Sequence, residues 1–498
     1  MNTSLIRKAI LISTIIISSC FGIHMNAQTL PKREMRGIWI STVSNIDWPS
    51  KPGLTTKQLQ QETDGILDHL QEMGFNAVFF QVRPASDAFY ASYTEPWSVY
   101  LTGKQGVAPE KDFDPLQYWI EQSHRRGMEL HAWINPFRAT TNVQKGSSPL
   151  HITQTHPEWI IQYNKKGYID PGIPEARSYL YKIIEEITHN YDIDGIHLDD
   201  YFYPYPVEKE TFRDALSFQA HNPKALPLAE WRRQNINQFI AGAHTTIKTT
   251  KPWIAFGVSP FGVWRNASDD ARGSQTKAGT TAYDNLYADV LTWMENQWID
   301  YVIPQIYWES AHPSANFNTL AEWWAQQPGC TKYIGHALYK INTGTAAWLD
   351  KKEMPNQLIK ARKTQNIEGS VFFSYKQFNR SLLGLDSFLT TNHYKYKALT
   401  PDLYLQKNPV IKIDRIKEKN HILHWQTNND ELVRFFVVYR YQKKDRFNTR
   451  DAKFIYSITD GNTIQLDGKR GEKYHYVIAP VDRYRKEHEP SKKIKVKN

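Results

Sequence analysis

Short apolar segments alternate with longer stretches of helical periodicity over the first four fifths of the chain. The segments are rich in β-branched and aromatic residues, as buried strands are. The stretches between them repeat apolar residues every three or four positions, for example TKQLQQETDGILDHLQEMG and LQYWIEQSHRRG, the second ending at a glycine suited to a helix C-terminus. Eight segments predict strands, at 36–42, 77–83, 129–136, 195–200, 253–260, 301–308, 332–339 and 370–376.

Eight strand–helix repeats within roughly 350 residues predict an α/β fold, the (β/α)8 TIM barrel. A doubly wound open sheet is the alternative, but no glycine-rich phosphate loop follows the first strand. We expect the barrel to cover residues 32–393.

The pattern changes after the barrel, at about residue 405. Residues 405–498 contain short β-rich segments separated by turn signals, which predict a small all-β sandwich. Trp425 on an early strand and the alternation from Tyr474 to Asp482 resemble a fibronectin type III module.

The net charge of +10 is concentrated in this tail. Residues 401–498 hold 22 lysines and arginines against 13 acidic residues, so the rest of the chain is close to neutral. A basic module can favour an anionic polymer or a membrane surface, although a soluble charged surface fits equally well. Because the tail lacks the acidic side chains described below, we expect it to be dispensable for chemistry.

The N-terminus has the features of an export signal, in residues 1–27. Arg7 and Lys8 precede an apolar run. Cleavage after Ala27 and lipidation of Cys20 within a lipobox-like ISSC are both open. With either kind of processing we expect an exported bacterial protein, located in the periplasm or held at the outer membrane as a lipoprotein by a possible lipid anchor.

Only two cysteines occur, Cys20 and Cys330, so we expect no disulfide. No Cys/His spacing suggests zinc. We expect a monomer that needs no metal or organic cofactor and binds no nucleic acid.

In a barrel enzyme the active site lies at the C-terminal ends of the strands. Polar and aromatic residues occupy nearly every such end of this chain, and that convergence favours a binding site. The fourth strand ends in two adjacent acids, Asp199 and Asp200, the two principal candidates for catalysis. By strand period, Ile196 and Leu198 should face the helices, whereas His197, Asp199 and Tyr201 should face the interior. Glu309 is the best second carboxylate, with Asp87 in reserve.

Substrate contacts are expected from the side chains around these acids. Arginines can bind carboxylates, and aromatic rings can stack on sugar faces. The candidates are Arg83, His131, Trp133, Asn135, Arg138, His197, Tyr201, Tyr203, Trp264, Gln305, Tyr307 and Trp308.

Several long motifs occur in the order found in one known group. They include REMRGIWISTV, GFNAVFFQVRPASDAFY, ELHAWINPFR, YDIDGIHLDDYFYP and VIPQIYW. At these motifs the chain resembles the YngK-like, family 10 glycosyl-hydrolase-like proteins, from about Lys32 to His393. The resemblance implies a barrel, a glycosidase-type site, an exported bacterial protein and cleavage of denuded peptidoglycan, meaning glycan strands without stem peptides.

The fourth strand also resembles two other glycosidase patterns. GIHLD is similar to the α-amylase segment that ends in the nucleophile, but His197 stands where those enzymes carry an arginine. DGIHLDDY is similar to the family 18 chitinase pattern, with His197 and Tyr201 each replacing an acid. That likeness would leave Asp199 where an acetamide-orienting acid sits.

We therefore expect an exported glycoside hydrolase acting on cell-wall glycan. A hydrolase of another polysaccharide and a non-catalytic glycan-binding protein are the alternatives. Retaining, inverting and substrate-assisted chemistry all stay open at this point.

Overall fold

The computed structural model of the chain describes residues 30–110, 113–403, 410–468 and 471–497. The predicted export signal, including Cys20 and Ala27, lies outside the described residues. Within the described residues, no helix combines the length and the apolar character needed to cross a bilayer.

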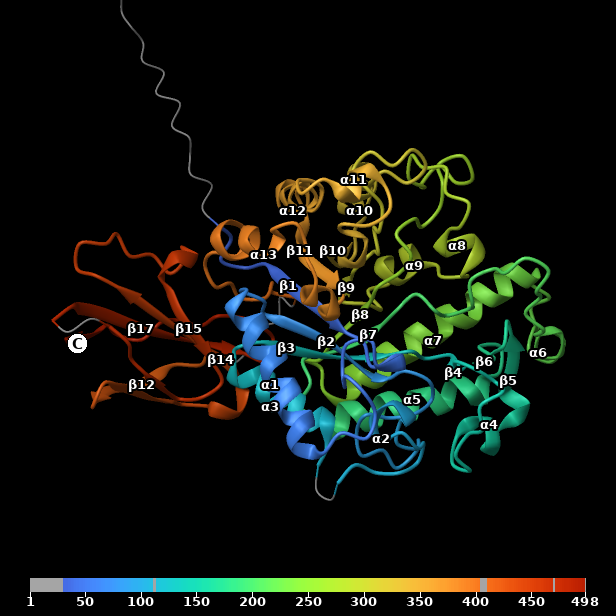
Figure 1. Ribbon diagram of the computed structural model, residues 1–498, viewed down its shortest axis with the longest axis horizontal. Helices are drawn as coiled ribbons and strands as arrows, with labels where there is room; N and C mark the ends of the chain where they lie inside the picture. The colour runs from blue at the N-terminus through green and yellow to red at the C-terminus, as the bar shows by residue number, and fades with distance from the viewer. Residues whose placement is uncertain (1–29, 111–112, 404–409, 469–470, 498) are drawn as a thin grey trace, which may run out of the picture.

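Eight parallel strands form a closed barrel, which confirms the predicted fold class (Figure 1). Around the barrel their order is β1, β11, β10, β9, β8, β7, β3 and β2. Each of the eight predicted segments overlaps a barrel strand, but most strands end earlier than expected. Their bounds are β1 Met35–Ile40, β2 Ala77–Arg83, β3 Glu129–Ile134, β7 Gly195–Leu198, β8 Ala255–Val258, β9 Tyr301–Val302, β10 Thr331–Ala337 and β11 Ile367–Phe373.

A helix follows every barrel strand and covers its outer side. These helices are α1 Thr56–Glu72, α3 Pro115–Arg125, α5 Pro174–Asn190, α7 Leu228–Thr250, α9 Val290–Glu295, α10 Phe317–Gln326, α12 Glu353–Lys363 and α13 Leu385–Phe388. Shorter helices lie in the loops, namely α2 Val99–Thr102, α4 Ile152–Thr155, α6 Ala215–Ala220, α8 Ala282–Asn285 and α11 Ala346–Leu349.

Local sequence explains where two of these helices begin. The Thr55 hydroxyl accepts a hydrogen bond from the backbone N–H of Gln58, and the Gln58 side chain accepts one from the backbone of Thr55, which is a capping box. Asp114 caps α3 by accepting a hydrogen bond from the backbone N–H of Gln117, and Pro115 occupies the first helical position. These caps fix where each helix begins after its loop at the barrel mouth.

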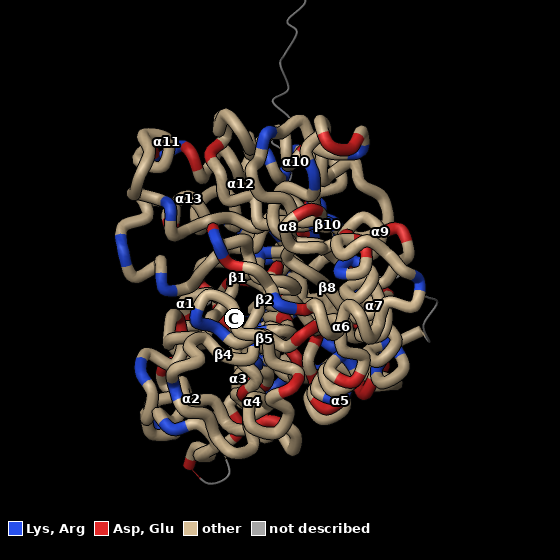
Figure 2. The backbone as a smooth tube through the Cα atoms, turned by 90° about the vertical axis from the view of Figure 1, so that its right-hand side faces the viewer, with Lys and Arg blue, Asp and Glu red and all other residues tan. Residues whose placement is uncertain are grey.

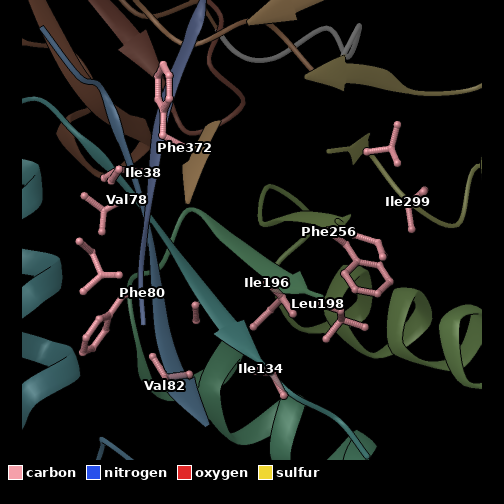
Figure 3. Close-up of a cluster of buried hydrophobic side chains, with 14 of the residues drawn as sticks. Ile38, Val78, Phe80, Val82, Ile134, Ile196, Leu198, Phe256, Ile299 and Phe372 are labelled. Atoms are coloured by element: carbon pink, nitrogen blue, oxygen red, sulfur yellow. The ribbon is translucent and has the colours of Figure 1, made fainter. Parts of the chain in front are cut away.

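The strand period divides the barrel residues into two layers, as predicted. Ile38, Val78, Phe80, Ile196 and Leu198 belong to the apolar layer between strands and helices (Figure 3). The alternate residues fill the barrel interior with a separate cluster that includes Trp39, Phe79, Trp133, Tyr301 and Val371.

An additional sheet stands beside the barrel mouth. It has the order β4–β6–β5, with β4 Arg138–Thr140, β5 Ile160–Tyr163 and β6 Lys166–Ile169. In Figure 1 this sheet and the tail lie at opposite ends of the barrel. The sheet therefore extends the mouth and does not touch the tail.

The tail consists of two antiparallel sheets, of order β12–β13–β16 and β15–β14–β17–β18. Their bounds are β12 Ile413–Lys419, β13 Ile422–Thr427, β14 Val433–Tyr441, β15 Ile455–Thr459, β16 Thr463–Gln465, β17 Lys473–Asp482 and β18 Ile494–Lys497. Trp425 is buried between the sheets with Phe436. The closer resemblance to a fibronectin type III module stays a prediction.

Seen from the right-hand side of Figure 1, basic and acidic positions are interspersed around the barrel (Figure 2). This mixture agrees with the near-neutral charge that the sequence assigns to that part of the chain.

Arginines of the tail close the base of the barrel. The Arg485 guanidinium donates from Nε and Nη2 to the two Glu129 oxygens, at 2.6 and 2.9 Å, and both side chains are buried. Arg434 forms a second bidentate pair with Asp192, with both N···O distances at 2.9 Å. Burial alone would raise the pKa of Glu129, but Arg485 and His131 hold it below its ordinary value. This geometry counts against the expectation that the tail is dispensable.

Replacing Arg485 with methionine should lower the free energy of unfolding by about 3–5 kcal/mol, because the buried charge of Glu129 would lose its arginine partner. Chemical denaturation of the full chain measures the loss. The double variant Arg485→Met/Glu129→Gln should recover part of it, and Arg446→Met, at an exposed arginine of the same module, should change it by less than about 0.5 kcal/mol. Equal stability of the Arg485 and Arg446 variants would show that the pair is not needed.

Candidate active site

A cavity of about 450 Å³ opens at the C-terminal ends of the barrel strands. Side chains at the ends of all eight strands, or in the loops just after them, line it. The lining residues are Trp39, Ser41, Val43, Ile46, Gln81, Trp133, Arg138, Asp199, Asp200, Tyr201, Tyr205, Ser259, Phe261, Gln305, Tyr307, Trp308, Tyr339, Lys340 and Phe373.

Asp199 and Asp200 enter this cavity directly after β7, and each is 4% exposed. Burial raises the pKa of Asp199 to about 7; Arg138 opposes the rise, and the charge of Asp200 adds to it. Burial also raises the pKa of Asp200, although hydrogen bonds from Tyr205 and Gln305 oppose this. Two adjacent carboxyl groups with raised pKa values are disfavoured from ionising together, which favours one protonated acid beside one carboxylate.

Neutral donors hold both carboxyl groups in place. The Asn135 amide donates to Asp199, and the Tyr205 hydroxyl donates to Asp200. Asn135 is held in turn by the Gln81 amide, which donates to it at 2.6 Å. The Gln81 oxygen accepts from the backbone N–H groups of Thr42 and Val43, both at 2.8 Å. The orientation of Asp199 is therefore fixed from three neighbouring strands.

A chain of buried hydrogen bonds runs from the floor of the cavity to the base of the barrel. Trp39 donates its indole N–H to His197 Nε2 at 3.1 Å, so His197 carries its proton on Nδ1 and faces the Tyr301 hydroxyl at 3.3 Å. Tyr301 contacts His131 Nδ1 at 2.9 Å, and His131 Nε2 contacts Glu129 at 3.1 Å. Burial lowers the pKa of His197 well below its ordinary value, so the His197 ring is uncharged.

The structure brings eight of the predicted site residues together on the cavity wall. They are Trp133, Arg138, Asp199, Asp200, Tyr201, Gln305, Tyr307 and Trp308. The Arg138 guanidinium lies 4.8 Å from the centre of the Tyr201 ring, and Gln305 donates to the Ser259 carbonyl at 2.9 Å.

Three other predicted residues lie one layer below the wall. Asn135, His131 and His197 are fully buried and bonded within the barrel, so the prediction that they contact substrate is wrong for this geometry. They position the groups above them instead.

Arg83 is also wrongly predicted as a substrate contact. It is fully buried, and its guanidinium forms a bidentate pair with Glu95 at 2.6 and 2.7 Å. It also donates to the carbonyls of Asn135 and Pro136. The N–H groups of this side chain that could bind a ligand already donate to protein atoms, and some of these bonds hold the loop after β3.

The two aromatic side chains Trp264 and Tyr203 are likewise not at the cavity. Trp264 is buried and stacks on Trp323 at 6.1 Å between ring centres. Tyr203 is buried against Arg232 and Phe212. Both residues lie in loops whose depth the strand pattern does not reveal.

Neither Glu309, predicted as the second carboxylate, nor the reserve candidate Asp87 lines the cavity. Glu309 lies outside its wall, close enough for its charge to act on Lys340. Strand period does not predict where Glu309 points, because β9 ends at Val302, seven residues earlier. Asp87 is buried beside Gln105 in a separate pocket of about 60 Å³.

The sequence reasoning missed several lining residues, including Trp39, Phe261, Lys340 and Phe373. Trp39 lies two residues before Ser41 and therefore faces the same side of β1, so the alternation along this strand could have predicted it. Lys340 lies three residues beyond the end of β10, in a short turn that strand patterns do not locate.

Among the described residues, no group of three or more His, Cys, Asp or Glu side chains is arranged to hold a metal ion. The chemistry available to the cavity walls is proton transfer by the two acids, ion pairing by Arg138 and Lys340, and stacking by aromatic rings.

Comparison with known proteins agrees with this arrangement. The family model described as glycosyl hydrolase-like 10 matches residues 34–351, which include all barrel strands except β11. The chain is 39% identical to glycosyl hydrolase YngK of Bacillus subtilis (strain 168), over 97% of each chain. It is 38% identical to glycosyl hydrolase DigH of Escherichia coli (strain K12), over 70% of this chain and 84% of that protein.

Among solved structures, the glycoside hydrolase domain of PgaB (BpsB) from Bordetella bronchiseptica aligns with 72% of this chain and 98% of its own, with a TM-score of 0.49 and 11% identity. The family model and the two relatives show what the chain is. It belongs to the glycosyl hydrolase-like 10 family and is a glycoside hydrolase.

Proposed function

We propose that the enzyme hydrolyses the glycan strands of peptidoglycan after their stem peptides have been removed. The observation that carries this proposal is the charge pattern of the cavity, which combines two buried carboxyl groups with two cations. Among the described residues, neither Arg138 nor Lys340 has a carboxylate within 4.0 Å. Cations without a carboxylate in ion-pair contact at a sugar site favour a substrate with carboxylates of its own.

The two cations lie on opposite sides of the mouth. Arg138 follows β3 and Lys340 follows β10, and these strands are four positions apart in the ring of eight. Lys340 is held by a hydrogen bond from its ammonium group to the Tyr307 carbonyl at 2.5 Å, and Arg138 by one to the Pro84 carbonyl at 3.3 Å. A glycan with a carboxylate on every second sugar could contact both.

The lactyl group of muramic acid supplies such a carboxylate. In intact peptidoglycan the stem peptide is joined to it through an amide, which removes the charge and adds bulk. A site built around free carboxylates should therefore prefer peptide-free strands. Aromatic rings of the wall, among them Trp133, Tyr201 and Trp308, provide faces for the sugar rings.

The acids supply the hydrolytic step. Cleavage of a glycosidic bond needs one carboxyl group that protonates the leaving oxygen and a second group that stabilises or attacks the anomeric carbon. Asp199, with a pKa raised to about 7, keeps a proton available at neutral pH. Asp200 is the neighbouring carboxylate, and Tyr205 holds it in place.

We also propose that the enzyme acts outside the cytoplasm, where cell-wall glycan is available. The basic and apolar pattern of residues 1–27 supports export, followed either by cleavage after Ala27 or by lipidation of Cys20.

The wild-type enzyme should release short oligosaccharides from peptide-free strands, as measured by mass spectrometry of the products. Asp199→Asn and Asp200→Asn should each lower the rate by about 10²–10⁴-fold without unfolding the protein. Asp386→Asn, at an exposed acid, is the matched control and should keep the wild-type rate. Near wild-type turnover by both cavity variants would show that Asp199 and Asp200 are not the catalytic acids. If the enzyme released oligosaccharides only from another polysaccharide, the proposed substrate would be wrong.

Loss of either cation should lower the activity of the enzyme on strands whose lactyl carboxylates are free. Arg138→Met and Lys340→Met should each lower kcat/KM on peptide-free strands by the equivalent of about 1.5–3 kcal/mol, and have less effect on strands whose lactyl carboxylates are amidated with ammonia. Lys351→Met, at an exposed lysine nearby, is the control. If intact and peptide-free strands were cleaved equally, the substrate would be wrong while the glycosidase activity would stand.

A further inference from the structure

The cavity wall holds acids on one side only. Asp199 and Asp200 are the only carboxylates among its lining residues in the described part of the chain. They are consecutive residues, so their Cα atoms are about 3.8 Å apart, and both follow the same strand, β7. In the ring of eight strands β11 lies opposite β7, and it contributes Phe373 to the wall.

A protein nucleophile needs a different arrangement. It attacks the anomeric carbon from the side opposite the leaving group, whereas the acid stands on the leaving-group side. Retaining enzymes of that kind place their two carboxyl groups across the bond, about 5–5.5 Å apart. Here Asp199 and Asp200 both follow β7, and no carboxylate among the described lining residues comes from a strand on the opposite side of the barrel.

Asp47, a half-buried acid in the loop after β1, is not free to take this role either. Asp47 accepts hydrogen bonds from the backbone N–H groups of Ser41 and Lys376, at 2.7 and 2.6 Å, and from the Ser374 hydroxyl at 2.9 Å. Both of its oxygens are occupied, and it does not line the cavity.

The tyrosines of the wall are also unsuitable nucleophiles. Burial, together with the charge of Asp200, raises the pKa values of Tyr201 and Tyr205 above that of a free phenol. Burial raises the pKa of Tyr307 well above the ordinary value, and burial also raises the pKa of Tyr339. A phenolate is therefore disfavoured at all four positions.

We propose that the nucleophile is the carbonyl oxygen of the substrate's own C2 acetamide group, and that the sugar whose bond is cleaved must carry an N-acyl group. This inference rests on the proposed function. Both sugars of a peptidoglycan strand are N-acetylated, so the group is present whichever residue occupies the reacting position.

In the first step the acetamide oxygen bonds to C1 as the bond from C1 to the leaving oxygen breaks. The electron pair goes to the leaving oxygen, which takes the proton of the protonated carboxyl group of the pair. The ionised carboxylate accepts the acetamide N–H, and transfer of that proton leaves a neutral oxazoline.

In the second step water attacks C1, and the bond from C1 to the oxazoline oxygen breaks. Its electron pair returns to the carbonyl, the nitrogen recovers its proton from one carboxyl group, and the other carboxylate takes a proton from the water. The net change is addition of one water, with the configuration at C1 retained. Adjacent carboxyl groups suit this chemistry because the acetamide and the leaving oxygen lie on neighbouring carbons of one sugar.

The test compares peptide-free strands that differ only in their N-acyl group. Strands are N-deacetylated, and portions are re-acylated with acetyl or trifluoroacetyl groups. With wild-type enzyme, the acetyl strands should regain cleavage. The trifluoroacetyl strands should react at least about tenfold more slowly, a barrier increase of about 1.4 kcal/mol, because fluorine withdraws electrons from the attacking oxygen. Deacetylated strands should not be cleaved.

The configuration of the products provides a second readout. Proton NMR of the first turnovers should show the retained anomer, and mass spectrometry of quenched enzyme should show no glycosyl adduct. Equal rates on acetyl and trifluoroacetyl strands, an inverted product or an adduct on Asp199 or Asp200 would each overturn the inference and leave the proposed function intact. If acetyl strands were not cleaved at all, the proposed function itself would fail.

Discussion

The ion pair between Arg485 and Glu129 is the interaction on which the interior of this barrel depends. Glu129 is 2% exposed, and a buried carboxylate without a cation is strongly destabilising. The pair anchors a chain of hydrogen bonds through His131, Tyr301 and His197 that ends at the cavity floor. The arginine comes from the tail, so the tail completes the barrel and should not be regarded as an attached accessory.

A neutral floor in turn sets the electrostatics of the site above it. Because burial keeps His197 uncharged, this side chain does not compensate the charges of Asp199 and Asp200. Arg138 at the mouth opposes the rise in the pKa of Asp199 but does not cancel it. The pair therefore retains a proton at neutral pH, while Asn135 and Tyr205 fix the directions of the two groups. The site has a proton donor because the two carboxyl groups are not both ionised.

The sequence contained the barrel and the acid pair because both follow from local rules. Strand period assigned Ile196 and Leu198 to the helix layer, and the rule for strand ends placed Asp199 and Asp200 at the mouth. Arg83 shows where local rules stop. It ends β2 as predicted, but Glu95, twelve residues later in a loop, folds back to pair with it. The contact between Arg485 and Glu129 spans 356 residues, and no periodicity could indicate it.

The most direct test of this account is a carbon-13 NMR titration of the aspartate side-chain carboxyl groups, with Asp199→Asn and Asp200→Asn used to assign the signals. The account predicts that the Asp199 carboxyl group of the wild-type protein titrates near pH 7, and that Asp200→Asn moves this titration to lower pH by removing a neighbouring negative charge. Titration of both groups near pH 4, unaffected by replacement of either neighbour, would contradict it.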